Sequence, residues 1–196
     1  MKTLVALFLL LSLSPLWAGS LKTIIIDAGH GGRDIGGHKG KVYEKWLALD
    51  TALRLERKLK QKGFRTVMTR RSDQFISLAG RTAIANRYSN AAFVSIHYNY
   101  TWKSHVCGFE TFYHSSRSRP LAQYVQAGML NRLEAVNRGV KYARYYVIRH
   151  SKIPAILVEG GFVSNRKECE RIKEGWFRES IAEGIADGIV RYKRSL

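Results

Sequence analysis

Cysteine and proline are both scarce in this chain of 196 residues. Its two cysteines, Cys107 and Cys169, are too few for a disulfide scaffold, and they lack the Cys-x-x-Cys spacing of a thiolate metal site. In an oxidising compartment they can pair with each other; the alternative is two buried free thiols, and the sequence leaves both open. With three prolines, no internal repeat and no low-complexity tract, the chain shows no sign of an interdomain linker.

Long apolar runs are missing except in the first twenty residues, which have the pattern of an export signal. Lys2 supplies the positive start, an apolar core covers 4–13, and the small residue Ala18 follows. The apolar core is shorter than the ~20 residues needed to span a bilayer, which argues against a membrane anchor. We therefore expect a signal peptide over 1–20, cleaved after Ala18 or two residues later. The domain 21–196 would then act in the periplasm or outside the cell, with no stable membrane insertion.

Acidic residues are also few: 15 aspartates and glutamates face 33 lysines and arginines, which gives a formal net charge of +18. Such a positive field attracts polyanions. Nucleic acid is the usual partner of a basic protein, but export argues against it. We expect the anionic cell wall or anionic lipid headgroups instead; the alternative is that the charge serves solubility alone.

Apolar runs typical of buried strands alternate with helical patterns along the exported part of the chain. Strands are expected over 22–27, 64–69, 91–97, 108–114 and 154–158, with a further short strand over 143–148. Helices are expected over 44–62, 78–88, 118–136 and 177–192, the second of them capped by Ser77. This alternation predicts a single α/β domain, with a mostly parallel twisted sheet of about six strands and helices on both faces.

Four residues with metal-binding or acid–base chemistry stand at expected strand ends or at a helix start. His30 follows the first strand, Glu44 starts the first helix, His97 ends the third strand, and Glu159 ends the last strand. Ligand sites of open α/β sheets gather beyond the carboxyl ends of the strands, so these four residues can converge on one crevice.

Two imidazoles and one carboxylate form a set that can hold one zinc ion and leave a position open for water. On this reading His30, Glu44 and His97 are the ligands, and Glu159 is the general base that takes a proton from the water. Asp27 is a candidate partner for a ligating imidazole, or alternatively a loop-capping residue. Against a zinc site, a single histidine after a strand is commonly a hydrogen-bonded loop residue, and the short HExxH motif is absent.

The sequence around these residues is distinctive. The four segments are Ile25-Ile26-Asp27-Ala28-Gly29-His30-Gly31-Gly32, Tyr43-Glu44-Lys45, Val94-Ser95-Ile96-His97 and Pro154-Ala155-Ile156-Leu157-Val158-Glu159-Gly160-Gly161-Phe162. In this order they resemble the zinc-dependent N-acetylmuramoyl-L-alanine amidases with an α/β catalytic domain, a group that includes bacterial division and spore-cortex amidases. The resemblance runs from about residue 22 to residue 192, which is nearly all of the exported domain.

The resemblance implies zinc ligation by His30, Glu44 and His97, with Glu159 catalytic. It also implies hydrolysis of the amide between N-acetylmuramic acid and L-alanine in peptidoglycan, which releases the stem peptide. We expect a monomer; whether a protein activates it is left open. Two other functions compete: a zinc peptidase that cuts within the stem peptide, and a wall-binding protein without catalysis, which would be marked by loss of one of the four residues.

Some positions depart from the family or have two interpretations. Gly160 stands where the family commonly has leucine, which would enlarge the floor of the cleft. Tyr98, Tyr100 and Trp102 are expected either to contact sugar rings or to pack. The connection over 114–120 is short, and because some division amidases carry a blocking helix in a long insert, we expect an open cleft here. Other residues lie outside these motifs. Glu110 is expected to support the site structurally, and Arg149 either to bind a substrate carboxylate or to be solvated. The remaining histidines, His38, His105, His114 and His150, are expected to be surface or hydrogen-bonded residues.

Overall fold

The computed structural model describes residues 21–196, so the expected export signal lies outside the described residues. A six-stranded sheet with the order β4-β1-β5-β8-β6-β7 forms its centre. The strands are β1 Thr23–Ala28, β4 Arg65–Met68, β5 Ala91–Asn99, β6 Phe109–Tyr113, β7 Asn137–Tyr142 and β8 Ala155–Phe162. Parallel pairing joins β1 to β4 and β5, and β5 to β8, whereas β6 runs antiparallel to β8 and parallel to β7. The mostly parallel sheet is therefore confirmed.

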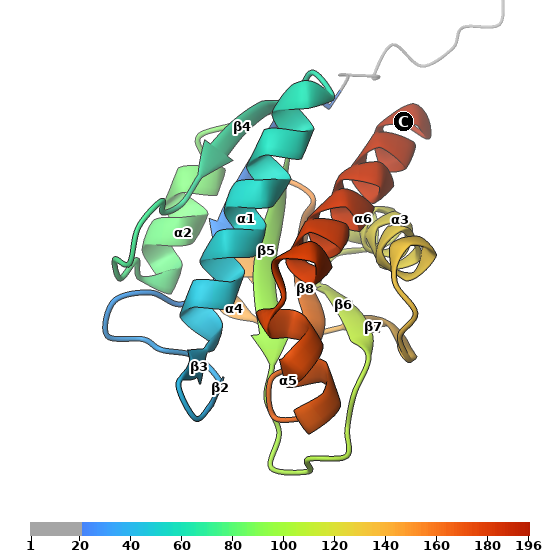
Figure 1. Cartoon of the computed structure of the whole chain (residues 1–196). Coiled ribbons are helices and arrows are strands. Elements are labelled where there is room, and N and C mark those ends of the chain that lie inside the picture. The colour runs from blue at the N-terminus through green and yellow to red at the C-terminus, as the bar shows by residue number, and fades with distance from the viewer. Residues whose placement is uncertain (1–20) are drawn as a thin grey trace, which may run out of the picture.

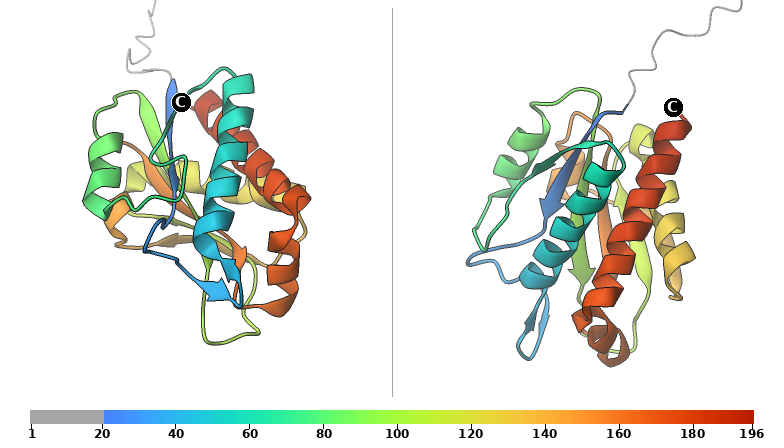
Figure 2. Two further views of the ribbon diagram at one scale, coloured as in Figure 1. Left: turned by 60° about the vertical axis from the view of Figure 1, so that its left-hand side comes forward. Right: turned by 45° about the horizontal axis from the view of Figure 1, so that its top comes forward.

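Helices cover both faces of this sheet, as the sequence predicts (Figures 1 and 2). One face packs against α1 Glu44–Gln61, α3 Arg119–Arg132 and α6 Gly175–Arg194, and the other against α2 Leu78–Ala85 and the short α4 Tyr146–Arg149. A further helix, α5 Arg166–Lys173, lies between β8 and α6. The isoleucines of β1 are completely buried because they face a helix layer on either side. Both faces of the sheet are thus removed from water, and the ends of the strands remain for chemistry.

A small hairpin stands at the carboxyl end of the parallel strands. It consists of β2 His38–Lys39 and β3 Val42–Tyr43, and it leads directly into α1 (Figure 1). The sequence did not predict it, because its strands are two residues long and partly or fully exposed, with no apolar alternation. Its position is important because it brings the first residue of α1 to the strand ends.

The expected strand over 143–148 is wrong. The sixth strand is β7, which precedes that segment, and 146–149 form the helix α4 instead. β7 is an edge strand with a polar sequence and a positive φ of 81° at Gly139, so it gives no apolar signal. Val147 and Ile148, which suggested a strand, are buried against the sheet by one helical turn. The third predicted helix also ends early, at Arg132, because Leu133 is extended, and α5 was missed.

Ion pairs join α1 to α6 on the outside of the domain. Lys58 contacts Glu179 and Glu183, and Lys62 contacts Glu183 and Asp187. The hydrogen bond from Lys58 lowers the pKa of Glu179 to about 2. These partly exposed pairs occupy acidic side chains of α6, and each pair is individually weak.

We expect Glu179→Gln to be less stable than the parent at pH 7, by less than about 1 kcal/mol. The folded pKa of Glu179 lies below its unfolded value, so the stabilisation is present above about pH 4.5 and is lost as the pH falls toward about 2. Urea unfolding at pH 7, 4 and 2.5 measures the deficit, which should shrink with acidity. Glu134→Gln, at an exposed glutamate without an ion pair in residues 21–196, is the control. A deficit independent of pH would contradict this account.

Both cysteines are free: Cys169 is buried and Cys107 is partly exposed. The structure therefore agrees with the free-thiol alternative, except that Cys107 is not buried. Among the helices of residues 21–196, none is both long and apolar enough to cross a bilayer.

Candidate metal and catalytic site

The four residues singled out in the sequence come together at the carboxyl ends of the parallel strands. His30 lies in the loop after β1, Glu44 is the first residue of α1, and His97 on β5 is the register partner of Glu159 on β8. All four line a single pocket of about 550 Å³ on the side of α2 and α4. The predicted convergence is therefore confirmed.

Three donor atoms form a nearly equilateral triangle. His30 Nε2 lies 3.0 Å from Glu44 Oε1 and 3.1 Å from His97 Nδ1, and the last two atoms are 2.9 Å apart. Ligands around a tetrahedral zinc ion with bonds of ~2.0–2.1 Å are about 3.3 Å from one another. Because the triangle is only slightly smaller than this, and its donors are two nitrogens and a carboxylate oxygen, the site fits one zinc ion.

Two of the three donor residues, His30 and Glu44, are held by further hydrogen bonds. Asp34 Oδ1 lies 2.9 Å from His30 Nδ1, so this carboxylate orients the ring with Nε2 toward the triangle. The backbone N–H of Tyr98 donates to Glu44 Oε1 at 3.0 Å, and that of Gly37 donates to Oε2 at 2.7 Å. Burial alone would raise the pKa of Glu44, but hydrogen bonds from His30 and His97 lower it to about 2. The ligand set is thus pre-oriented, with its carboxylate ionised.

Asp27 is not the partner of an imidazole. Its carboxylate accepts hydrogen bonds from Thr69 and Ser95 and forms a buried ion pair with Arg81, each contact at 2.7 Å. It therefore ties three neighbouring elements together below the site. The imidazole partner is Asp34, which the sequence analysis missed; its spacing of four residues from His30 in a glycine-rich loop was the available signal.

The loop that carries His30 is strained and is held by two buried arginines. His30 has a φ of 59°, in the left-handed region that non-glycine residues rarely occupy. Arg81 donates to the carbonyls of Ala28 and His30 at 2.6 Å, and Arg70 donates to those of Ala28 at 2.9 Å and Gly29 at 2.6 Å. These bonds satisfy the loop carbonyls and stabilise the unusual backbone conformation.

The ring of His97 lies directly against Gly29, where there is no room for a side chain. A Cβ atom added to Gly29 would be 2.4 Å from Cε1 and 2.6 Å from Nε2 of His97. Gly29→Ala is therefore expected to displace His97 and to weaken zinc binding by about 10-fold or more, on the scale of other changes beside metal ligands. Calorimetric titration of the metal-free protein with zinc measures this change.

Gly40→Ala is the control for that substitution, because nothing lies within 4 Å of an added Cβ at Gly40. Its positive φ of 58° costs some stability, but zinc affinity should not change. Equal zinc affinity in Gly29→Ala and the parent would show that zinc binding does not require His97 in its observed position.

Glu159 is a buried carboxylate that lacks a partner for one of its oxygens. The residue is 8 % exposed, and Oε2 has no hydrogen-bond partner within residues 21–196. Burial raises the pKa of Glu159 well above its usual range, and the negative charges of Glu44 and Glu110 add to the rise. An unpaired buried carboxylate is unfavourable for stability, so its presence beside the donor triangle points to chemistry.

Glu110 supports the sheet beside Glu159, with which it is in register across β6 and β8. Its carboxylate accepts from Asn99 at 2.7 Å and from Arg138 at 2.9 Å, and it also pairs with Lys141. Both its oxygens have partners within the protein, which agrees with the supporting role expected from the sequence.

Of the two alternatives left open for Tyr98, the structure supports packing, and the expectation that Gly160 enlarges the cleft is wrong. Tyr98 does not reach substrate: its ring is completely buried, and its hydroxyl lies 2.6 Å from Thr51 Oγ1 of α1. Gly160 does not enlarge the cleft. A Cβ atom there would point to the side of the sheet on which the Tyr98 ring lies, 3.0 Å from Cε1 of Tyr98. The tyrosine thus fills the space beside the glycine on the helix side of the sheet. Tyr100 and Trp102 are 54 % and 83 % exposed, so packing does not account for them.

The connection over 114–120 has no bearing on access to the site. Because β6 runs antiparallel to β8, this connection lies at the opposite end of the sheet, where Ser118 Oγ accepts from the N–H of Ala155 at 2.9 Å. The walls of the pocket come instead from the segment before α2, from Tyr100 and from the start of α4. His30 and His97 keep 21 % and 17 % of their side chains exposed, so the site is reachable from solvent.

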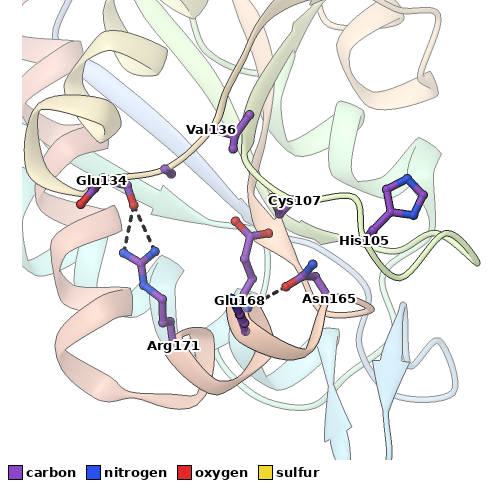
Figure 3. Close-up of a pocket in the computed structure, with 9 residues that line it drawn as sticks. His105, Cys107, Glu134, Val136, Asn165, Glu168 and Arg171 are labelled. Carbon is purple, nitrogen blue, oxygen red and sulfur yellow. Dashed lines mark hydrogen bonds between the residues drawn. The ribbon is translucent and has the colours of Figure 1, made fainter.

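The other residues considered in the sequence lie away from the donor triangle. Arg149 is exposed on α4, and His38, His105, His114 and His150 are on or near the surface, as expected. His105 lines a second cavity of about 740 Å³ between the loop before β6 and α5 (Figure 3). The buried acid in that cavity, Glu168, accepts from the N–H groups of Gly108 and Phe162 at 2.8 and 2.7 Å, which is a structural role.

Known proteins match the chain over almost its whole described length. Residues 24–191 match the family model of N-acetylmuramoyl-L-alanine amidase. LytC of Bacillus subtilis, an N-acetylmuramoyl-L-alanine amidase, is 37 % identical over 177 residues, which are 88 % of this chain but 36 % of LytC. The chain thus spans about a third of that relative.

Solved structures agree. The N-acetylmuramoyl-L-alanine amidase AmiC2 of Nostoc punctiforme is 38 % identical, with a TM-score of 0.84 over 88 % of this chain and 97 % of that one. An amidase of Clostridium difficile 630 is 37 % identical, with a TM-score of 0.86 over 90 % and 98 %. With this similarity and the assembled site, the chain belongs to the family of zinc-dependent N-acetylmuramoyl-L-alanine amidases, which are hydrolases with this α/β catalytic domain.

Proposed function

We propose that this protein is an exported zinc hydrolase that cuts the amide bond between N-acetylmuramic acid and L-alanine in peptidoglycan and releases the stem peptide. The observation that carries the proposal is the unpartnered oxygen of Glu159 beside a triangle of three zinc-type donors in an accessible pocket. A wall-binding protein without catalysis would not need this buried carboxylate, and all four site residues are present and assembled.

His30, Glu44 and His97 are the residues that would hold the metal. Bound zinc would supply hydroxide near neutral pH from coordinated water and would polarise the scissile carbonyl. Glu159 accepts the proton of the attacking water and then delivers it to the departing nitrogen of L-alanine. Its raised pKa suits this double role, because the carboxyl keeps a proton to higher pH than an ordinary glutamate. The burial that raises the pKa of Glu159 also keeps other water molecules away from the proton that its carboxyl group carries.

Digestion of purified peptidoglycan followed by mass spectrometry tests the proposal. An amidase leaves intact glycan and frees peptides that begin with L-alanine. A zinc peptidase acting within the stem would instead leave shortened peptides on the glycan. Metal content measured on the same sample should be one zinc per chain. Shortened peptides left on the glycan would show that the protein cuts within the stem peptide, which would contradict the proposal.

The proposed setting is outside the cytoplasm, in the periplasm or at the cell wall, with the enzyme acting as a monomer. The expected signal over 1–20, the positive net charge of +18 and the cell-wall amidases among the relatives support this setting. One structural relative, the CwlD amidase of Clostridioides difficile, is described in complex with the GerS lipoprotein. Nothing in the described residues identifies a corresponding partner here.

A further inference from the structure

Acidic residues are distributed very unevenly along the chain. Between Asp73 and Glu159 the sequence contains only two, Glu110 and Glu134. Glu110 is buried in its ion pairs. This stretch carries α2 and α4, the helices on the pocket side of the sheet. These two helices contain no acidic residue, whereas α1 and α6 on the other face contain three each, so the pocket side of the sheet is poor in negative charge.

Five exposed cations, two beside the pocket and three toward the opposite end of the sheet, form what we call the cationic band. They are Arg87, Arg117, Arg144, Arg149 and Lys152. None of them forms an ion pair with an acidic side chain of residues 21–196, in contrast with the lysines between α1 and α6. Their charges are thus available to a partner.

Hydrogen bonds join the chain segments that carry the cationic band. The turn after α4 is tied to the end of α2, because Asn86 Nδ2 donates to the carbonyl of His150 at 3.0 Å and accepts at Oδ1 from the N–H of Lys152 at 2.7 Å. This contact brings the chain segment that carries Arg87 to the segment that carries Lys152. Arg117 Nη2 donates to the carbonyl of Lys152 at 2.7 Å, which brings it to the same turn.

The band begins at the wall of the catalytic pocket. Tyr145 and Tyr146 line that pocket and are 46 % and 39 % exposed. Arg144 precedes them directly, and Arg149 lies one turn after Tyr145, with its N–H bonded to the Tyr145 carbonyl at 3.0 Å. Residues four apart share a helix face. A polymer leaving the pocket over these tyrosines would therefore meet arginines at once.

We propose that the cationic band binds the carboxylates of stem peptides that neighbour the one being cut on the same glycan strand. The inference rests on the proposed function, because that function brings a glycan with carboxylate-bearing peptides into the pocket. Guanidinium groups bind carboxylates with paired hydrogen bonds, and four of the five cations are arginines. The band would hold the polymer while the pocket holds one muramic acid residue.

Sedimentation with insoluble peptidoglycan, chemically stripped of phosphate polymers, tests this proposal. All proteins carry Glu159→Gln, so that the wall is bound without being cut. Arg144→Gln combined with Arg149→Gln is expected to weaken binding about fivefold or more, the effect of losing two exposed ionic contacts. Arg166→Gln combined with Lys167→Gln removes the same charge from exposed positions on α5 and should change binding less than twofold. Thermal melting confirms that both variants fold.

Three results would overturn the proposal. Equal weakening by the two double variants would mean that total charge matters, and not the band. Unchanged binding after chemical amidation of the wall carboxylates would remove the proposed ligand. Binding only to wall that retains its phosphate polymers would show that the cationic band binds phosphate groups and not carboxylates. Cleavage is measured separately, so products other than those of an amidase would count against the proposed function while leaving the binding result intact.

Discussion

Replacing Glu159 with glutamine is expected to lower kcat by about 10²–10⁴-fold, the usual contribution of a positioned acid–base group. Glutamine keeps the shape of the side chain but cannot accept and return a proton. The donor triangle of His30, Glu44 and His97 does not include Glu159, so zinc content should stay at one ion per chain. Release of L-alanine-terminated peptide from wall and elemental analysis of the same preparation measure the two quantities.

Glu168→Gln is the matched control, because Glu168 is also a buried acid with a raised pKa. Both its oxygens accept backbone N–H groups, so its replacement should cost stability and leave kcat within about twofold. Unchanged turnover in Glu159→Gln would remove Glu159 from the proposed role. Loss of zinc in that variant would instead show that the carboxylate helps to hold the metal.

The Glu159→Gln variant also tests whether the buried carboxylate of Glu159 destabilises the folded protein. The folded pKa of Glu159 is raised, so the folded state loses stability as the pH rises from about 4.5 through that folded pKa. The metal-free Glu159→Gln protein should therefore match the parent near pH 4 and exceed it at pH 7.5. A gain of about 1.4 kcal/mol corresponds to each unit of raised pKa. Urea unfolding in the presence of a chelator measures this difference.

The features predicted correctly from the sequence depend on local patterns or on general rules of α/β sheets. The buried isoleucines of β1 gave a strand because no other environment suits a run that is apolar on both faces. His30, His97 and Glu159 were placed together because strand ends of a parallel sheet share one edge. Neither argument needs knowledge of which side chains touch.

The features that were missed depend on contacts between distant segments. Asp27 was the candidate partner for a ligating imidazole, and only the folded loop shows that Asp27 pairs with Arg81 and that Asp34 contacts His30. The pairing of Tyr98 with Gly160 joins adjacent strands on their helix side, so neither residue reveals it alone. The connection over 114–120 was misjudged because its end of the sheet depends on the antiparallel direction of β6.

Removing the metal is the second change with a large expected effect. Dialysis against a chelator should reduce turnover below detection, and one equivalent of zinc should restore it, because bound zinc would supply both the hydroxide and the polarisation of the scissile carbonyl. Within residues 21–196, His30, Glu44 and His97 are the group of donors placed to share such an ion. Zinc binds only the folded arrangement, so the melting temperature should rise when the metal is returned. Calorimetry and an activity assay on the same samples report both effects.

His97→Ala tests whether this metal effect belongs to the donor triangle. Removing one of three ligands should cost both zinc and turnover, whereas His114→Ala removes an imidazole that contacts the carbonyl of Ala143, at the far end of the sheet. His114 also packs against the ring of Tyr142, which is likewise away from the donor triangle. The control should bind one zinc and keep its activity. If His97→Ala still binds one zinc with the parent's affinity, the ion lies elsewhere, and the pre-oriented triangle around Glu44 must have another purpose. Since His97 also faces Glu159 across β5 and β8, its loss should reduce turnover even where high zinc concentration refills the site.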